Sequence, residues 1–130
     1  MRLLLDTHAF LWFVAGDASL SRTAREAIEA PGNEVFVSVA TAWEIAIKVS
    51  LAKLTLDAPS VAAFFDEQME ANGFAFLPID PPHVFRLATL AFHHRDPFDR
   101  LLVAQAMEEG MSLVTREAAV FASYGVTLLW

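Results

Sequence analysis

The chain alternates short apolar segments with longer segments that have the periodicity of helices. The apolar segments, which we predict to be strands, are residues 3–5, 35–37, 74–79 and 112–114, with a possible fifth strand at 126–128. Strands that are apolar on both faces have to be covered on both faces, and helices between successive strands leave those strands parallel. We therefore predict an α/β fold, a three-layer α/β/α domain with a central parallel sheet of four to five strands.

Helices are predicted in the segments between these strands. The first covers residues 7–15 and ends at Gly16, and the others are expected around 20–28, over 41–51, over 60–72, over 80–91 and over 101–107. Residues 93–97 form a polar loop before the last of these helices, which is apolar on most sides and therefore expected to be buried. The helix over 7–15 is also apolar nearly all round, so it is either a core helix or one that offers a patch to a partner.

Length and composition restrict the organisation and the chemistry. The 130 residues contain no repeat and no linker, so we expect one domain over 1–130. The absence of cysteine excludes disulfides, thiolate zinc sites and cysteine nucleophiles. Asp6 interrupts the apolar start too early for a signal peptide, and the apolar run at 9–15 is too short to span a bilayer. We therefore expect a soluble, cytoplasmic protein with no membrane partner.

Five acidic residues are placed by this predicted topology at one edge of the sheet. Asp6 follows the first strand, Glu44 lies in the first turns after the second, and Glu117 comes just after the fourth. Asp96 and Asp99 open the buried helix that precedes the fourth strand. Because ligands of parallel sheets bind at the carboxyl ends of the strands, we expect these side chains to gather in a functional site.

Each acid also has an ordinary structural explanation. Asp6, Asp96 and Asp99 can cap helices, Glu44 can pair with Lys48 one turn later, and Glu117 suits the positive end of a helix. Together, however, five like charges repel one another unless a cation lies among them. Carboxylate oxygens without histidine or cysteine ligands suit Mg²⁺ or Mn²⁺ and suit zinc poorly. Since no glycine-rich phosphate loop is present, the residues favour metal-assisted hydrolysis of phosphodiesters over hydrolysis of nucleoside triphosphates.

Several segments resemble the PIN domain, and most closely the VapC-type toxin ribonucleases of bacterial toxin–antitoxin pairs. They are LLLDTH at 3–8, WEIAIK at 43–48 followed by Lys53 and Leu54, HRDPFDRLL at 94–102, LVT at 113–115 and YGV at 124–126. The resemblance covers essentially the whole chain, in order. It implies that Asp6 and Asp99 are the principal metal ligands and that Glu44 is the acid of the second segment. Glu117 lies where the family usually has aspartate. We include Asp96 with these four acids in the predicted metal-binding set, with a supporting or a structural role as its alternatives.

The resemblance also implies a function. PIN domains are similar in being RNases that depend on Mg²⁺ or Mn²⁺, and the toxins cut structured or transfer RNA at a single-stranded loop. It implies catalysis by Asp6, Glu44, Asp99 and Glu117, a homodimer, and inhibition by a cognate antitoxin. The alternative is a PIN-fold binding module whose activity is impaired at Glu117. A receiver-like signalling domain is disfavoured, because Pro81 and Pro82 make Asp80 a helix cap.

The net charge of −7 argues against a nucleic-acid partner when it is taken alone. Without the five clustered acids, however, eleven acidic residues remain against nine basic ones, close to balance. RNA affinity would then rest on the nearby cations, each of which has a salt bridge as its ordinary alternative: Lys48, Arg95, Arg100 and Arg116. His93 and His94 are expected to be solvated loop residues, with phosphate contact as the alternative. The Thr7 and Thr115 hydroxyls can either cap helices or orient water and ligands.

Overall fold

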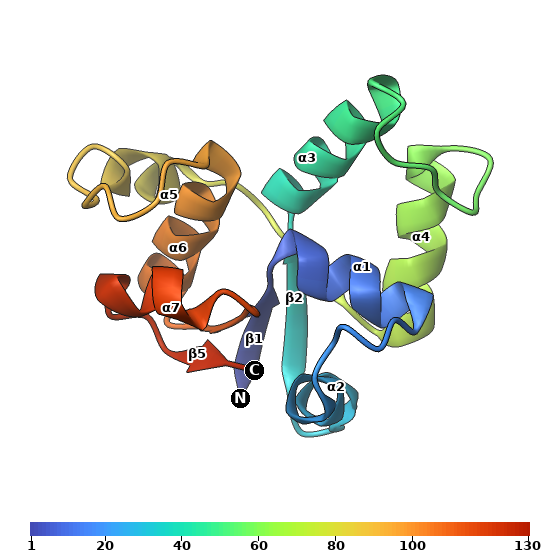
Figure 1. The fold of residues 1–130 in the computed structure, drawn as a ribbon, viewed down its shortest axis with the longest axis horizontal. Helices are drawn as coiled ribbons and strands as arrows, with labels where there is room; N and C mark the ends of the chain where they lie inside the picture. Colours follow the sequence, from blue (N-terminus) through green and yellow to red (C-terminus); the bar gives the residue numbers. More distant parts are fainter.

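The computed structural model describes all of residues 1–130, and its centre is a parallel sheet of five strands in the order β3-β2-β1-β4-β5 (Figure 1). Every neighbouring pair is parallel, with Leu4 of the central strand aligned with Phe36 on one side and Leu113 on the other. The strands are β1 (Arg2–Leu5), β2 (Glu34–Ser38), β3 (Ala75–Leu77), β4 (Ser112–Val114) and β5 (Leu128–Leu129). The predicted parallel sheet is confirmed, including its fifth strand.

Helices cover both faces of the sheet, as the apolar strands require (Figure 1). One layer contains α1 (Thr7–Ala15), α2 (Arg22–Glu29), α3 (Val39–Ser50) and α4 (Val61–Asn72). The other contains α5 (Pro81–Arg86), α6 (Pro97–Glu109), the short α7 (Ala118–Phe121) and a 3-10 turn over Ala122–Tyr124. Strand β1 shows the division directly, because Leu3 and Leu5 enter the core under the first layer while Leu4 enters the core under the second.

The boundaries of several elements differ from the sequence prediction for local reasons. Strand β3 ends at Leu77 instead of continuing to 79, since Pro78 has no N–H to offer a neighbouring strand. Helix α5 ends at Arg86 and not at 91. Helix α6 begins at Pro97, four residues before the predicted start, because Asp96 caps it and proline is favourable in the first turn. Strand β5 covers Leu128–Leu129, and the sequence did not predict α7.

Helix α1 packs against the core without being enclosed by it. Phe10 is fully buried, and its ring stacks on that of Phe65 with the ring centroids 5.6 Å apart. The next four side chains along the helix, Leu11 to Val14, are half-buried against the same core. The helix is therefore neither enclosed by the core nor fully exposed. None of the helices combines the length and the apolar character that crossing a membrane requires.

Candidate active site

Asp6 lies where β1 meets α1, at the carboxyl edge of the sheet. Its backbone N–H donates to the Val114 carbonyl of β4 at 3.1 Å, which continues the sheet pairing by one residue. Its Oδ1 accepts from the Ala9 N–H at 2.8 Å, so the predicted capping role is confirmed. Only 5% of the residue is exposed, and this burial raises the pKa of the Asp6 carboxyl. One carboxylate oxygen is thus committed to the helix, and the group is costly to keep ionised.

Glu44 reaches the same edge from the second turn of α3. The Thr7 hydroxyl donates to its Oε1 at 2.7 Å, and Lys48 Nζ lies 3.0 Å from its Oε2. The Thr41 hydroxyl in turn lies 3.2 Å from that of Thr7. The predicted pair with Lys48 is therefore present, and Thr7 orients a carboxylate instead of capping a helix. These contacts fix the start of α3 beside the start of α1.

Asp96 and Asp99 have different roles at the start of α6. Asp96 caps the helix, because its Oδ1 accepts from the backbone N–H groups of Phe98 and Asp99 at 2.8 and 3.2 Å. The Asp99 side chain, in contrast, lies near the other acids. Burial raises the pKa of Asp99 to about 7, with further increases from the charges of Asp96, Asp6 and Glu44. Carboxylates from three segments therefore lie near enough to oppose the ionisation of Asp99.

His94, from the predicted loop, lies among the acids. Its Nε2 lies 3.0 Å from Asp99 Oδ2 and 3.8 Å from Glu117 Oε2. Its Nδ1 accepts the Asp96 N–H at 3.1 Å, so a neutral ring carries its proton on Nε2 and donates toward Asp99. The side chain is only 20% exposed. The expectation that His94 is a solvated loop residue is therefore wrong. The sequence feature that could have indicated its contact with the acids is its position two residues before Asp96, which caps α6.

Glu117 comes from the turn between β4 and α7. Its backbone N–H donates to the Thr115 hydroxyl at 3.1 Å, which makes Thr115 part of the local turn. The side chain is half exposed, and its charge contributes to the raised pKa of Asp6. Ligand atoms of Glu117, His94 and Asp99 all lie within 4.8 Å of one another. Together with the effect of the Asp6 and Glu44 charges on Asp99, these distances show that acidic side chains from four segments lie near one another at this edge.

The predicted cations differ in what they are free to do. Lys48 forms an ion pair with Glu44, which was the alternative to a role in binding RNA. Arg100 is buried and donates to the Leu90 and Ala91 carbonyls at 3.3 and 2.8 Å, so it supports the loop. Arg116 is exposed, forms no ion pair, and places its guanidinium carbon 5.7 Å from the centroid of the Trp12 ring. Arg95 is likewise exposed and forms no ion pair, so Arg95 and Arg116 are the predicted cations that remain available to a ligand.

The donor set at this edge fits a hard divalent cation. It consists mainly of carboxylate oxygens, and the burial that raises the pKa values of Asp6 and Asp99 leaves their negative charges poorly solvated. A divalent cation among them would offset that charge, and Mg²⁺ and Mn²⁺ prefer oxygen ligands. The side chains that could hold it are those of Asp6, Glu44, Asp99 and Glu117, whereas Asp96 is engaged in capping.

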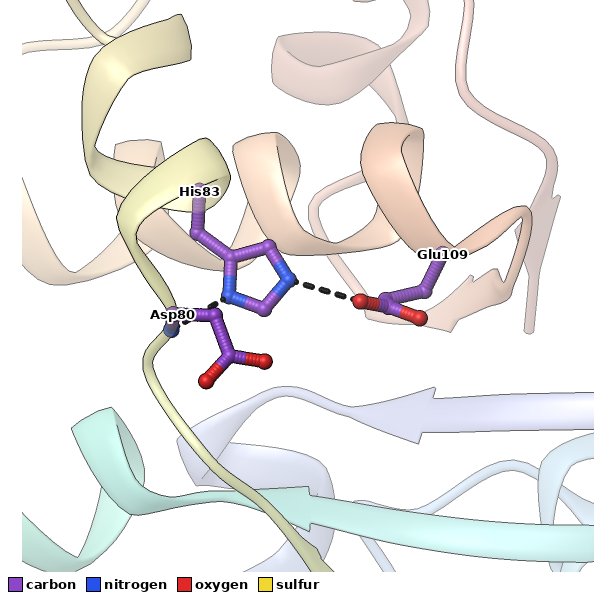
Figure 2. Close-up of side chains that lie close together, drawn as sticks. All are labelled: Asp80, His83 and Glu109. Carbon is purple, nitrogen blue, oxygen red and sulfur yellow. Dashed lines mark hydrogen bonds and ion pairs between the residues drawn. The ribbon is translucent and has the colours of Figure 1, made fainter.

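A second histidine lies among acids away from this edge, between α5 and the end of α6. His83 is 1% exposed, and both of its ring nitrogens have partners (Figure 2). Its Nδ1 accepts the Asp80 N–H at 3.0 Å, and its Nε2 lies 2.9 Å from Glu109 Oε1. This group joins α5 to the end of α6, and the Gln105 amide beside it contacts Pro78, directly after β3, and Ser38, at the end of β2.

The fold and the site together define the class of protein: a parallel α/β/α domain whose carboxylates gather at the carboxyl edge of the sheet, where such folds bind their ligands. Within that class, the family model for the PIN domain matches residues 3–126, and the chain belongs to the PIN-domain family. No curated protein matches the sequence significantly.

Solved structures support the same fold at low sequence identity. VapBC2 from Rickettsia felis, bound to a DNA fragment from its promoter, superposes with a TM-score of 0.75 at 16% identity, over 98% of this chain and 97% of that chain. FitAcB from Neisseria gonorrhoeae gives 0.59 at 21% identity, over 97% and 95% of the two chains. VapBC-5 from Mycobacterium tuberculosis, a toxin–antitoxin system, gives 0.58 at 22% identity, over 98% and 96%.

Proposed function

We propose that this protein is a metal-dependent endoribonuclease that hydrolyses RNA phosphodiester bonds and acts as the toxin of a type II toxin–antitoxin pair. The observation that carries the proposal is the gathering of Asp6, Glu44, Asp99 and Glu117 at one sheet edge, with the His94 ring 3.0 Å from Asp99 Oδ2. Membership of the PIN-domain family supports it, since nuclease chemistry is typical of that family.

Each residue has a distinct task in this proposal. Asp6 and Asp99 are the principal metal ligands, and Glu44 is a further ligand whose carboxylate is oriented by the Thr7 hydroxyl. Glu117 completes the set from its half-exposed position, directly or through water. When bound, Mg²⁺ or Mn²⁺ supplies the Lewis acid that activates water and stabilises charge on the phosphate. Asp96 holds the first turn of α6, and with it Asp99, at the edge.

We also propose the partners that such a toxin requires. The neighbouring structures are of complexes named VapBC, FitAB and toxin–antitoxin complex, which supports a cognate antitoxin for this chain. The substrate is RNA, and transfer RNA is the first class to test. We propose a homodimer of chains in which residues 1–130 act as one domain, in the cytoplasm. The half-buried apolar face of α1 is a surface on which an antitoxin can dock.

A second candidate function is a binding module that retains the fold without catalysis. Glu117 favours it, because a longer and half-exposed side chain occupies the position where the family pattern has aspartate. This module would bind RNA or the antitoxin but leave RNA intact.

The experiment that decides between them uses purified protein freed of antitoxin. Total RNA is incubated with Mg²⁺ or Mn²⁺, and in parallel with EDTA, beside the variant Asp6→Asn. Asparagine keeps the acceptor that caps α1, so the variant isolates the loss of charge. Discrete fragments that disappear with EDTA and with Asp6→Asn establish the nuclease. Intact RNA with folded protein that binds Mn²⁺ establishes the binding module.

A further inference from the structure

We propose that a pocket beside the carboxylates, lined by His8, Trp12 and Arg116, is a subsite that binds one unpaired nucleotide next to the scissile phosphate. The inference rests on the proposed nuclease function and deepens it. The pocket has a volume of about 350 Å³, and its remaining lining residues are Asp6 and Glu117. Its occupant therefore lies against two of the proposed metal ligands.

The walls of the pocket offer flat surfaces. The His8 ring is stacked on the Trp12 ring, with centroids 5.4 Å apart and an interplanar angle of 22°. The Arg116 guanidinium also lies against Trp12. Trp12 is braced from behind, because it packs on the core of the first layer and meets the Trp130 ring edge-on at 5.9 Å. The tryptophan is held in place, while His8 and Arg116 are exposed to solvent.

These chemical groups match an unpaired nucleotide. Proteins recognise single-stranded RNA by stacking splayed bases on aromatic rings and on arginine planes, and by neutralising the backbone with cations. Arg116 has no carboxylate partner although Asp6 and Glu117 line the same pocket, so its charge is available to a phosphate. A pocket of this volume is at the small end of ligand sites, which suits one nucleotide and excludes a duplex.

The subsite predicts how substrates are chosen. A base that is paired in a helix cannot enter the pocket, whereas a base in a loop can stack there and bring the adjoining phosphate to the carboxylates. Selection for an unpaired nucleotide next to the cleaved bond then follows from stacking, with little preference for base identity.

The first test measures binding with cleavage switched off. In the Asp99→Asn background, the affinity for fluorescein-labelled oligouridine is measured by fluorescence anisotropy in Mg²⁺. We expect His8→Ala and Arg116→Ala each to weaken binding by about fivefold or more, and Trp12→Leu by about fivefold to a hundredfold, since stacking contributes that range per base. Trp12→Phe, which keeps an aromatic face, should restore most of the loss. Phe85→Ala and Arg22→Ala, both exposed and outside the pocket, serve as matched controls and should not weaken binding.

The second test uses the parent protein and an RNA whose cleaved bond has been mapped. Removing the base next to that bond should lower kcat/KM in the parent by about fivefold to a hundredfold, mainly through KM, and should have little effect in Trp12→Leu. Thermal unfolding of Trp12→Leu and Trp12→Phe shows whether the pocket survives, and His8→Ala keeps the test valid if tryptophan cannot be replaced.

The outcomes separate this inference from the proposed function. If the parent cleaves RNA but the three pocket variants keep full affinity and the same penalty for a missing base, the subsite is wrong and the nuclease stands. If RNA is bound through the pocket but never cleaved, the nuclease is wrong and the subsite stands. If the variants weaken only the capture of the antitoxin, the pocket is a protein-binding site and the inference is overturned.

Discussion

The molecule contains two histidine–carboxylate groups with nearly the same local geometry. In each, Nδ1 accepts a backbone N–H from the residue that caps a helix, Asp80 for His83 and Asp96 for His94, at 3.0 and 3.1 Å. In each, Nε2 faces a carboxylate, that of Glu109 at 2.9 Å and that of Asp99 at 3.0 Å. The rings differ in their surroundings, because His83 is 1% exposed with one carboxylate partner while His94 is 20% exposed among several acids.

The comparison shows that a cluster of ligand-type side chains does not by itself define a site. The His83 group connects α5 to the end of α6, and the two nitrogens of its ring are fully used in that connection. The His94 group lies at the carboxyl edge of the sheet, where charges from other segments raise the pKa of Asp99. Under the proposed function, the feature that distinguishes the His94 group from the His83 group is this unfavourable gathering of carboxylate charge from separate segments.

The largest expected difference between the two groups is in cleavage. Asp99→Asn should reduce kcat/KM by at least about a thousandfold, because loss of a metal ligand removes several kcal/mol of transition-state stabilisation. The matched variant at the other group, Glu109→Gln, should cleave at the parental rate, since amide oxygen still accepts from His83 Nε2. Initial rates on one RNA at saturating Mg²⁺ provide the measurement. Comparable rates for Asp99→Asn and the parent would reject the site.

Stability should respond in the opposite way. His83→Ala leaves Glu109 Oε1 and the Asp80 N–H without their partner and opens a cavity in a fully buried position. We expect a loss of about 3 kcal/mol in the free energy of unfolding, from the two lost hydrogen bonds and the lost packing. Urea denaturation measures it, with His93→Ala, an exposed neighbour of the site, as the control. A loss below about 1 kcal/mol would show that the connection between α5 and α6 is dispensable.

His94→Ala should affect activity more than stability. The ring holds the Asp99 carboxylate and the Asp96 N–H, and partners that orient metal ligands typically contribute about tenfold to a hundredfold in activity or metal affinity. The dependence of kcat/KM on Mg²⁺ concentration should therefore shift to higher concentration. His94→Gln, which can donate to Asp99, should recover part of the activity. Parental Mg²⁺ dependence in His94→Ala would remove His94 from the site.

The pH dependence of metal-free stability should also come from the site. Folding raises the pKa values of Asp99 and Asp6, so the folded protein binds protons between about pH 4 and pH 7 that the unfolded chain does not. Stability in EDTA should therefore fall as the pH rises through this range, and Mg²⁺ should restore it at pH 8. Urea midpoints at pH 5 and pH 8 test this, and Asp99→Asn should flatten the slope while Glu109→Gln keeps it. Stability that rises with pH in EDTA would contradict the assignment.

The fold and the gathering of acids could be predicted from the sequence, but the separate role of each acid could not. Apolar strands and intervening helices fix a parallel sheet, and its carboxyl edge then collects Asp6, Glu44, Asp99 and Glu117. Aspartate is favourable at a helix N-cap, so both Asp96 and Asp99 could cap α6. Which of them does so depends on the residue at which the helix begins. The sequence also cannot show that His94 turns toward Asp99, because that contact requires the loop to fold back on its own helix.

Tertiary proximity explains the other features that were not predicted. Trp12 and Arg116 are separated by most of the chain, and only the neighbouring ends of β1 and β4 bring them together. Likewise, the Thr7 hydroxyl can orient Glu44 only once α1 and α3 start side by side. The sequence gives residue types and the edge at which they gather, whereas individual side-chain partners depend on distances of a few ångströms.

The smallest expected effect is at Glu117, the acid that departs from the family pattern. Its backbone is held by Thr115 and its side chain is half exposed, so a carboxylate one methylene shorter can still reach the cluster through water. Glu117→Asp should therefore preserve or improve cleavage, within about fivefold, which corresponds to about 1 kcal/mol. Calorimetry then measures the affinity of the protein for Mn²⁺. The substitution should change this affinity if Glu117 is a metal ligand, and should leave it unchanged if Glu117 is not. In the other histidine group, Glu109→Asp should change stability and leave cleavage unchanged, because that carboxylate contacts His83 away from the proposed catalytic residues. A tenfold loss of cleavage in Glu117→Asp would instead show that this site requires the longer side chain, and would make Glu117 an adapted ligand in place of an impaired one.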